Sequence, residues 1–519
     1  MSRIIFCVLA LFNILSINSE DKGMCPYWPT HKLKKQDRDQ TPEAPSIQTN
    51  IPAAQPTPSK FYQSSVESNL KRGDREYNPE AQIGGITLIT DAKTPEQQEG
   101  IISFHKASDS AALTTTPTKF KVLFSGYIKP EAYIDSRQVY GWRNDQVLLF
   151  PERKLWDRCH HDLNAHPQFT SIAIETRLRA EIVGPKVWDA WCMGAIEADF
   201  WGTNSLDING FRLRHAFITF DWGDKLLLFG QYWAPMFIPI CAPDTISFDA
   251  GVPFDPYKRA PQLRFAKIFD PFEIVFCAAS EVKFVNDGPI GGSSTYLRNA
   301  VVPNMNVRLT ATLGKTKDHY LGIDLDYRRI VPRLVTAQCL KAHESLNSLR
   351  FEAFASLNWP VFSIRSKVGF EQNATDYDSI SGYAVHTINP VTDERTYTNF
   401  NAATAWVDFI KYYKTFEPGL FIGYIKSLGT SDPIIPCVKY KDSCGHEICE
   451  KLVYSYGRED VDYVFRIAPR LRYYWKPVVL GAELEYTRAG WGTINTRGQV
   501  ENVESVGNTR LLVALFYFF

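Results

Sequence analysis

Nowhere does the sequence contain a run of about eighteen or more apolar residues, so no segment can cross a bilayer as an α-helix. It also lacks an excess of charge of one sign. Its 57 Lys and Arg balance 57 Asp and Glu, so bulk charge gives no reason to expect a nucleic-acid partner. The motifs G-x-S-x-G and H-E-x-x-H and the phosphate-binding loop are absent as well. We accordingly expect neither enzymatic activity nor a bound cofactor.

The N-terminus has the pattern of a secretory signal. Arg3 supplies a positive charge, the stretch from Ile4 to Leu15 is apolar apart from Asn13, and small residues precede Glu20. About twelve mostly apolar residues are too few for a membrane-spanning anchor, which is the alternative interpretation. We therefore expect residues 1–19 to be a signal peptide that is removed after export.

Residues 20–118 differ in composition from the rest of the chain. The run from Thr41 to Lys60 is rich in Pro, Gln and Thr, and such a segment cannot bury much apolar surface. We expect a disordered N-terminal extension here. A short strand at residues 84–90 is possible within it.

From Phe120 onward, long segments carry apolar residues at every second position. In residues 461–473, for example, Val461, Tyr463, Phe465 and Leu471 fall on one face, and aspartate and arginine fall on the other. Strands of soluble sheets usually have about five or six residues, whereas strands that span a membrane need about nine to eleven. The length of these segments therefore favours membrane strands.

Short turns and long polar connections alternate along this region. Short turns are predicted at Gly184–Trp188, Trp222–Lys225, Asp270–Phe272, Lys315–Asp318, Asn358–Val361, Lys414–Pro418 and Trp475–Val478. Long connections are predicted at 137–167, 233–259, 372–398 and 429–458. This asymmetry is typical of outer-membrane barrels and, with the chain ends counted, predicts about sixteen strands. The sequence thus predicts an all-β fold, with a transmembrane antiparallel barrel over residues 119–519 and the extension on its periplasmic side.

The C-terminus strengthens this interpretation. Leu511, Val513, Leu515, Tyr517 and the final Phe519 share one face of the last segment. A buried last strand of a soluble protein would also alternate, but few soluble proteins expose so apolar a terminus. The segment resembles the terminal strand by which bacterial barrels are recognised for insertion, so we expect the barrel-assembly machinery as a partner.

Four stretches resemble the trimeric DcaP-like, dicarboxylate-type porins of Gram-negative bacteria. They are FSGYIKPEAYIDSRQ (124–138), GFRLRHAFITFDW (210–222), LLLFGQYWAPMF (226–237) and VPFDPYKRAPQLRF (252–265). The resemblance covers roughly residues 120–519 and implies a sixteen-stranded, trimeric porin whose loop after the GQYW strand enters the lumen. The sequence departs from the family in its Pro-rich leader and its cysteines, so the family's solute class carries over only in part.

A diffusion channel has no catalytic centre, and its selectivity comes from the charges that line it. The arginines predicted to face the lumen are Arg177, Arg179, Arg212, Arg214, Arg264, Arg308, Arg466, Arg470 and Arg472, together with Arg510. Guanidinium groups bind carboxylate and phosphate, so a ladder of them would favour anionic solutes. Alternatively, the arginines pair with acidic residues on neighbouring strands, such as Glu175, Glu181, Glu197, Asp199, Glu483 and Glu485. His215 alternates with Arg212 and Arg214 and is predicted to face outward.

The connection 233–259 is the candidate constriction. Its prolines stiffen it, and its charged residues are Asp244, Asp249, Asp255, Lys258 and Arg259. A plain surface loop could have the same composition. Calcium binding by the three aspartates is a further alternative, although their spacing does not match an EF-hand.

Nine of the ten cysteines remain after removal of the signal that contains Cys7. Cys437, Cys444, His446 and Cys449 have a C-x6-C-x-H-x2-C spacing that could hold zinc. In an exported loop we expect instead a disulfide and one spare thiol, and no bound metal. Cys159, beside His160 and His161, leaves the same two interpretations open.

Three functions are compatible with the sequence. The first is an outer-membrane porin, in contact with lipid, for passive diffusion of small anionic solutes. The second is a structural or adhesive barrel with disulfide-linked surface loops, which would differ in having a closed lumen. The third is a secreted soluble β protein that binds carbohydrate, which would not need detergent for extraction.

Overall fold

The computed structural model describes residues 102–104 and 120–519, apart from 249–250, 315–317, 442–446 and 476. The predicted signal peptide, nearly all of the predicted extension and its possible strand at residues 84–90 lie outside the described residues. β1 (Ile102–Phe104) is described only as a short strand that pairs with β2. None of the helices in the described part of the chain is long and apolar enough to span a membrane.

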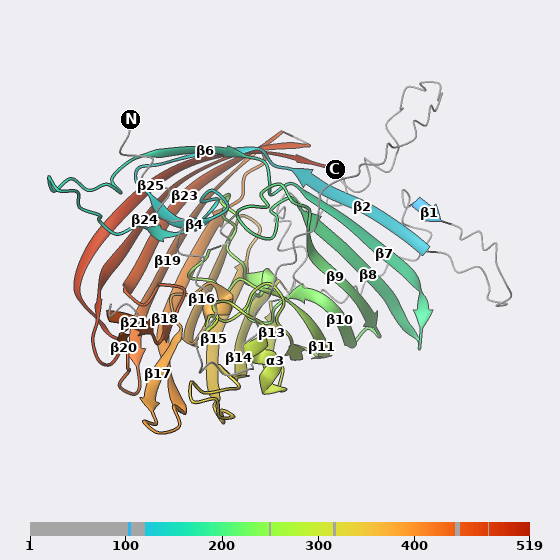
Figure 1. The fold of residues 1–519 in the computed structure, drawn as a ribbon. Coiled ribbons are helices and arrows are strands. Elements are labelled where there is room, and N and C mark those ends of the chain that lie inside the picture. The colour runs from blue at the N-terminus through green and yellow to red at the C-terminus, as the bar shows by residue number, and fades with distance from the viewer. Residues whose placement is uncertain (1–101, 105–119, 249–250, 315–317, 442–446, 476) are drawn as a thin grey trace, which may run out of the picture.

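The chain forms a closed antiparallel barrel of sixteen strands, as predicted. The first wall strand is divided into β2 (Phe120–Ile128) and β3 (Glu131–Asp135), and the second into β6 (Gln168–Ile172) and β7 (Arg177–Val187). The others are β8 (Ala190–Asp199), β9 (Arg212–Asp221), β10 (Lys225–Trp233), β11 (Arg259–Phe269), β12 (Phe272–Ala279), β13 (Asn304–Leu313), β14 (His319–Ile330), β15 (Leu346–Asn358), β16 (Phe362–Gln372), β18 (Arg395–Lys411), β19 (Phe416–Thr430), β23 (Val461–Trp475), β24 (Val478–Ile494) and β25 (Val500–Phe518). Figure 1 shows these strands side by side as one curved wall.

The last strand closes the barrel against the first. Arg510 of β25 is the register partner of Asp135 in β3, and Phe518 is the partner of Tyr127 in β2. The backbone amide of Phe519 donates to the carbonyl of Gly126 at 3.1 Å. Both ends of the barrel sheet are thereby hydrogen-bonded, and closure removes the open edges that β-sheets otherwise expose.

The outer face of the wall is apolar. In β25, Leu511, Val513, Leu515 and Tyr517 are 39–49% exposed, whereas Leu512 between them is buried. Exposed apolar residues occupy the same face around the barrel: Leu178, Ile196, Ile218, Phe229, Leu263, Phe276, Val307, Ile323, Phe351, Val368, Phe409, Tyr424, Leu471 and Leu484. Such a continuous band would be unstable in water and suits a bilayer. The predicted membrane strands are confirmed, and the soluble alternative is wrong.

The predicted short turns separate neighbouring strands, although residues 315–317 and 476 of two of them lie outside the described residues. Two of the predicted bounds need correction. Pro418, assigned to the end of a turn, lies within β19. Gly184 and Pro185 lie within β7 rather than in a turn, because the register between β7 and β8 shifts between Val183 and Lys186. The turn itself comes later, at Trp188 and Asp189, which separate β7 from β8. A glycine and a proline in a strand often mark such an irregularity, and here they do.

The longer connections carry small elements of their own. These are the hairpin β4 (Val139–Trp142) and β5 (Val147–Pro151), η2 (Pro239–Cys241), α3 (Thr295–Ala300), η3 (Thr375–Tyr377), β17 (Tyr383–Ile388), the hairpin β20 (Cys437–Lys441) and β21 (Glu447–Lys451), and β22 (Val453–Tyr454). The connection between β14 and β15 contains one isolated bridge, between Val335 and Lys341.

A polar network joins two of these connections at the rim. Arg333 donates to Glu344 at 2.7 Å and to Asp393 at 2.6 Å. Glu344 also accepts from the hydroxyl of Tyr397 at 2.5 Å and from the backbone amide of Arg395 at 2.7 Å. The rim around residues 331–345 and 389–395 is therefore held by charge-assisted hydrogen bonds, the stronger kind.

Candidate functional site

The connection between β10 and β11, residues 234–258, folds into the barrel. Its five prolines fix φ at their positions and limit the conformations of the segment. Phe237, Cys241 and Phe254 of this loop are fully buried and belong to a core cluster that also includes residues of the wall. The loop thus occupies the lumen, as the family resemblance implied.

Charged residues of β18, β23 and β24 hold the middle of the loop. Arg472 donates to both carboxylate oxygens of Asp244, at 2.7 and 2.9 Å. The backbone amide of Asp244 donates to Asp408, and that of Ile246 donates to Glu483, both at 2.8 Å. These charge-assisted contacts fix the tip of the loop against the wall.

Strands β16 and β18 hold the remainder of the loop. Lys367 lies 2.8 Å from a carboxylate oxygen of Asp255 and also donates to the carbonyl of Met236 at 2.8 Å. The indole of Trp406 donates to Asp255 at 3.1 Å. Because Arg466 of β23 also donates to the carbonyl of Val252 at 2.8 Å, the loop contacts the wall on several sides and spans the lumen.

The predicted lumen arginines all lie on the inner side of the wall, and most of them face a carboxylate. The ion pairs are Arg177 and Arg179 with Glu197, Arg212 and Arg214 with Asp199, Arg466 with Glu485, Arg470 with Asp408, Arg472 with Asp244 and Glu417, and Arg510 with Asp135. Pairing dominates because a buried charge without a partner costs several kcal/mol. The expected pairing across neighbouring strands accounts for much of this set.

Arg264 and Arg308 differ from the rest of the set. Arg264 donates to the carbonyl of Trp233 at 2.7 Å and lies over the ring of Tyr232. Arg308 is the register partner of Asp324 in the neighbouring strand. Neither makes an ion pair within 4 Å among the described residues, so their charges are less fully compensated than those of the other arginines.

The charged residues of the predicted constriction are also engaged, which leaves no shared calcium site among those described. Asp244 faces Arg472, and Asp255 faces Lys367. Lys258 forms ion pairs with Glu281 and Asp376. Arg259 is the first residue of β11 rather than part of the loop, and it donates to the hydroxyl of Tyr257 at 2.7 Å. Asp249 lies outside the described residues.

The prediction that His215 faces outward is wrong. The register between β8 and β9 shifts between Glu197 and Ala198, so that Glu197 pairs with His215 and Ala198 pairs with Leu213. At this bulge Arg214 and His215 are both fully buried. A bulge inserts an extra residue into one strand, which places two successive side chains on the same face.

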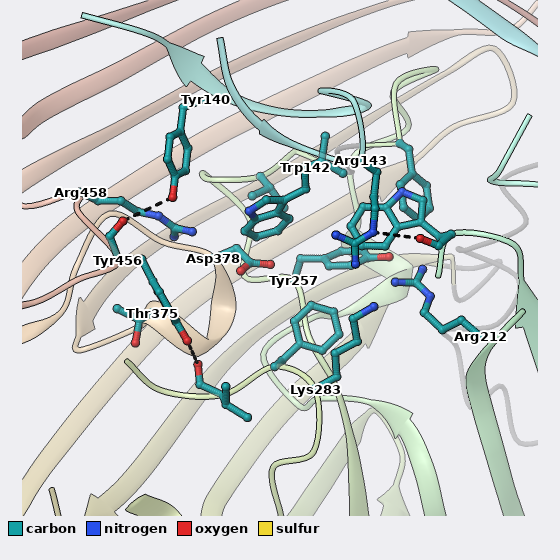
Figure 2. Close-up of a pocket in the computed structure, with 16 residues that line it drawn as sticks. Tyr140, Trp142, Arg143, Arg212, Tyr257, Lys283, Thr375, Asp378, Tyr456 and Arg458 are labelled. Carbon is teal, nitrogen blue, oxygen red and sulfur yellow. Dashed lines mark hydrogen bonds between the residues drawn. The ribbon is translucent and has the colours of Figure 1, made fainter. Parts of the chain in front are cut away.

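A cavity of about 220 Å³ opens where the long connections meet, and residues from several of them line it (Figure 2). Its cationic residues are Arg143, Arg212, Lys283 and Arg458, and its one acidic residue is Asp378. Among the described residues, Arg143, Lys283 and Arg458 form no salt bridge; they donate to the carbonyls of Trp201, Gly202 and Ser379. The lining therefore has more basic than acidic side chains, and three of the four basic residues have no salt-bridge partner in the described part of the chain.

Aromatic rings support these cations. The Arg143, Arg212 and Lys283 charges lie 4.1, 4.4 and 5.0 Å from the ring of Trp201. Cation–π contacts of this kind partly replace the water that burial removes. The ring of Trp201 thus contacts all three cationic groups and offsets part of their mutual repulsion.

The surroundings shift the pKa of Lys283 and Asp378, which line the cavity. Burial, together with the charges of Arg212, Arg259 and Arg143, lowers the pKa of Lys283 to about 6. Burial raises the pKa of Asp378 to about 8, against the opposing effect of Arg458. Both residues lie in connections outside the barrel strands, and both shifts follow from removing a charged group from water.

Sequence reasoning missed this cavity. Arg143, Lys283 and Arg458 lie in three connections that are far apart in the chain and show no period-two pattern. Only the concentration of Arg, Trp and Tyr in residues 140–143 and 456–458 could have drawn attention to it.

The cysteine-rich hairpin β20–β21 contains a disulfide between Cys437 and Cys449. The disulfide preferred from the sequence is therefore present, and it removes two thiolates that zinc would have required. Cys444 and His446 lie outside the described residues. In the described part of the chain, no group of three or more His, Cys, Asp or Glu is arranged to hold a metal ion. Cys159 is exposed and not in a disulfide.

Comparison with known proteins identifies similar folds rather than similar sequences. No protein-family model matches the chain, and no curated protein is significantly similar to it. The crystal structure of the outer membrane channel DcaP of Acinetobacter baumannii superposes with a TM-score of 0.53 at 17% identity, covering 77% of this chain and 97% of that one. OmpT of Vibrio cholerae (TM-score 0.44, 10% identity, 77% and 98% covered) and an anion-selective porin from Comamonas acidovorans (0.45, 9%, 77% and 100%) are less similar.

The similarity to DcaP confirms, at the level of the fold, the resemblance noted in the sequence. The chain has the fold of an outer-membrane channel, with an apolar band around a closed barrel. This architecture belongs in the outer membrane of a Gram-negative bacterium, where closed antiparallel barrels of an even number of strands reside.

Proposed function

We propose that this outer-membrane barrel is a porin for passive diffusion of small hydrophilic solutes, with a preference for anions that carry carboxylate or phosphate groups. The observation that carries the proposal is the lining of the cavity, which has four basic residues, Arg143, Arg212, Lys283 and Arg458, and one acidic residue, Asp378. Fixed charge in a narrow, low-dielectric passage raises the local concentration of the oppositely charged ion.

The paired arginines have a second role in this proposal. Arg212 pairs with Asp199 on β8, while Arg470 and Arg472 hold the loop 234–258 through Asp408 and Asp244. They set the cross-section of the channel rather than its net charge. Selectivity then depends mainly on the cations without a salt bridge.

The test is the reversal potential of the purified barrel in a planar bilayer under a salt gradient. We expect an anion-favouring potential for the natural protein. At pH 5, where Lys283 is protonated, the double variant Arg143→Ala with Lys283→Ala should reduce the anion-to-cation permeability ratio several-fold, because it removes two charges that form no salt bridge among the described residues. Arg497→Ala is the matched control, since Arg497 is exposed in the connection between β24 and β25 and does not line the cavity. A ratio unchanged in the double variant would contradict the proposed selectivity.

We further propose a homotrimer that is inserted by the barrel-assembly machinery through the strand ending at Phe519, with residues 1–19 removed on export and residues 20–118 in the periplasm. The resemblance to trimeric porins in residues 120–519 supports the trimer. Light scattering of the detergent-solubilised protein, corrected for bound detergent, tests it: a monomeric mass would contradict the trimer without affecting the channel proposal.

A second candidate is a structural surface barrel with a closed lumen. The loop that spans the lumen favours it, because Phe237 and Phe254 are fully buried inside the barrel. A correctly folded barrel that stays silent in the bilayer at all voltages would support this function over the porin.

A further inference from the structure

Three of the residues that line the cavity each have a buried polar side-chain atom without a hydrogen-bond partner among the described residues. The atoms are Nη1 of Arg212, Nε of Arg458 and Oδ2 of Asp378. A buried polar group without a partner costs about 1–3 kcal/mol, so proteins rarely retain one without reason. Two of these atoms can only donate a hydrogen bond, and the third accepts one when Asp378 is ionised.

The arrangement of these atoms is asymmetric. Figure 2 shows Arg143, Arg212 and Lys283 on one side of the cavity and Arg458 on the other, with Asp378 between them. Rings of Trp142, Tyr257, Phe248 and Phe284 form much of the remaining wall. A ligand that fits must therefore present an anionic group, a hydrogen-bond donor and an apolar face.

The size of the cavity suits a small ligand of one ring. Its 220 Å³ would hold about seven water molecules at roughly 30 Å³ each. A single six-membered ring with its substituents can be accommodated in that space.

We propose that the cavity binds a monosaccharide acid, a pyranose ring that carries a carboxylate, as such a solute passes through the mouth of the channel. The carboxylate accepts from Arg212 and its neighbours Arg143 and Lys283. A ring hydroxyl donates to Asp378, and the apolar C–H face of the sugar packs on the aromatic wall at Trp142. The inference rests on the proposed porin function and specifies its solute.

Other small anions satisfy the cavity less well. An aliphatic dicarboxylate brings neither a hydroxyl for Asp378 nor a ring face for the aromatic wall. A benzoate-like acid covers the rings but leaves Oδ2 of Asp378 without a donor. A neutral sugar supplies the hydroxyl but leaves the cations uncompensated. Sites built to hydrogen-bond a substrate hydroxyl discriminate strongly against analogues that lack it.

The experiment is calorimetric titration of the full-length barrel in a polyoxyethylene detergent, because sugar-based detergents would compete for the cavity. The probes are glucuronate, glucose, succinate and benzoate. We expect glucuronate to bind at least about ten-fold more tightly than each of the others. Asp378→Ala should weaken glucuronate binding about ten-fold, the effect of one lost buried hydrogen bond, and Asp378→Asn should weaken it less because it keeps an acceptor oxygen.

The matched control is Asp432→Ala, an exposed aspartate in the connection after β19 that does not line the cavity. It should bind glucuronate as the natural protein does, and heat-dependent gel mobility establishes that every variant is folded. Equal affinity for glucuronate and succinate, or an unchanged affinity in Asp378→Ala, overturns the inference. So does the absence of any binding heat, which would mean that water alone satisfies the cavity.

These failures differ from a failure of the proposed function. A barrel that shows anion-favouring reversal potentials but no preference for glucuronate remains a porin with another solute. A barrel that binds glucuronate but never conducts is a receptor-like closed barrel, which would overturn the channel and with it the passage step of the inference.

Discussion

Buried guanidinium groups in this barrel are of two kinds, and the difference lies in what each one contacts. Arg470 donates to both carboxylate oxygens of Asp408, at 2.7 and 2.9 Å. Arg143, in contrast, donates to the carbonyl of Trp201 and lies over its ring. The first kind neutralises a neighbouring charge and holds structure. The positive charge of the second kind is not neutralised by a salt bridge within the described residues and can attract an anionic solute.

Removing one partner of a paired group should therefore destabilise the fold. Arg470→Ala leaves Asp408 buried without its main counter-ion, so we expect the free energy of unfolding to fall by about 3–5 kcal/mol. Urea titration of the barrel in detergent, followed by tryptophan fluorescence, measures this loss. The control Asp224→Ala breaks the exposed pair with Lys267 and should cost no more than about 1 kcal/mol. Similar losses in both variants would contradict the distinction.

The charge of the cavity should change with pH in a definite direction. Lys283, with a pKa lowered to about 6, gains a positive charge as the pH falls through that value. Asp378, with a pKa raised to about 8, loses its negative charge as the pH falls through that value. Other charged groups that act on these two are Arg143, Arg212, Arg259 and Asp199 for Lys283, and Asp376, Lys258 and Arg458 for Asp378.

Both titrations add positive charge at lower pH, so anion preference should increase from about pH 9 to about pH 5. Reversal potentials in one fixed salt gradient across this range provide the measurement. In Lys283→Met the increase near pH 6 should disappear while the increase near pH 8 remains. A preference that declined on acidification would contradict the assignment.

At the scale of elements, the loop 234–258 depends on close approach to glycines of the wall. A Cβ atom placed on Gly423 of β19 would lie 2.6 Å from the ring of Phe254, and one on Gly481 of β24 would lie 2.9 Å from Ile246. Both contacts are shorter than van der Waals packing allows. The barrel wall therefore has space for Phe254 and Ile246 of the loop only because glycine, which has no side chain, occupies these two positions of the wall.

Gly423→Ala should displace Phe254 and loosen the loop. We expect a destabilisation of about 1–3 kcal/mol, as for other overpacked cores, together with an altered single-channel conductance. Gly184→Ala is the matched control, because its added Cβ would meet nothing closer than 3.3 Å. Conductance traces identical to those of the natural protein would show that the loop position does not set the open cross-section.

How far the sequence predicts these elements depends on what fixes them. Strands such as β23 and β25 are predictable because a bilayer on one side and a filled lumen on the other impose period-two alternation. The bulge at His215 is not, because one extra residue in a strand leaves little trace in an alternating pattern. Gly184 and Pro185 do leave a trace, but a bulge and a turn have the same composition.

The cavity is less predictable than the wall for a related reason. Arg143, Lys283 and Arg458 meet only because three irregular connections fold over the barrel mouth. Nothing periodic links them in the sequence. The predicted wall arginines, by contrast, follow directly from strand alternation, although their acidic partners could be assigned only once the strand register was known.

For the whole molecule, the apolar band fixes how the barrel sits in its membrane. Leu484 of β24 is 48% exposed and lies near the middle of the band, between the exposed Leu480 and Tyr486. Closure through Asp135 and Arg510 leaves no gap in the sheet at this height. A charged residue on this face would meet hydrocarbon.

Leu484→Arg should accordingly cost about 2–4 kcal/mol of folding free energy in a bilayer. Refolding into short-chain lipid vesicles under a urea series measures this cost. Leu206→Arg, at a fully exposed position in the connection between β8 and β9, should have no measurable effect. Equal effects at the two positions would mean that Leu484 does not face lipid.

The network of Arg333, Glu344, Asp393 and Tyr397 has a consequence for whatever meets the cell from outside. It ties together two segments separated by about fifty residues, so these two segments form one fixed surface relief at the rim rather than two independent peptides. An antibody or bacteriophage that recognises this relief reads both segments at once. A synthetic peptide of either segment would be a poor vaccine antigen, and an immunogen that reproduces the rim has to retain the folded barrel beneath it.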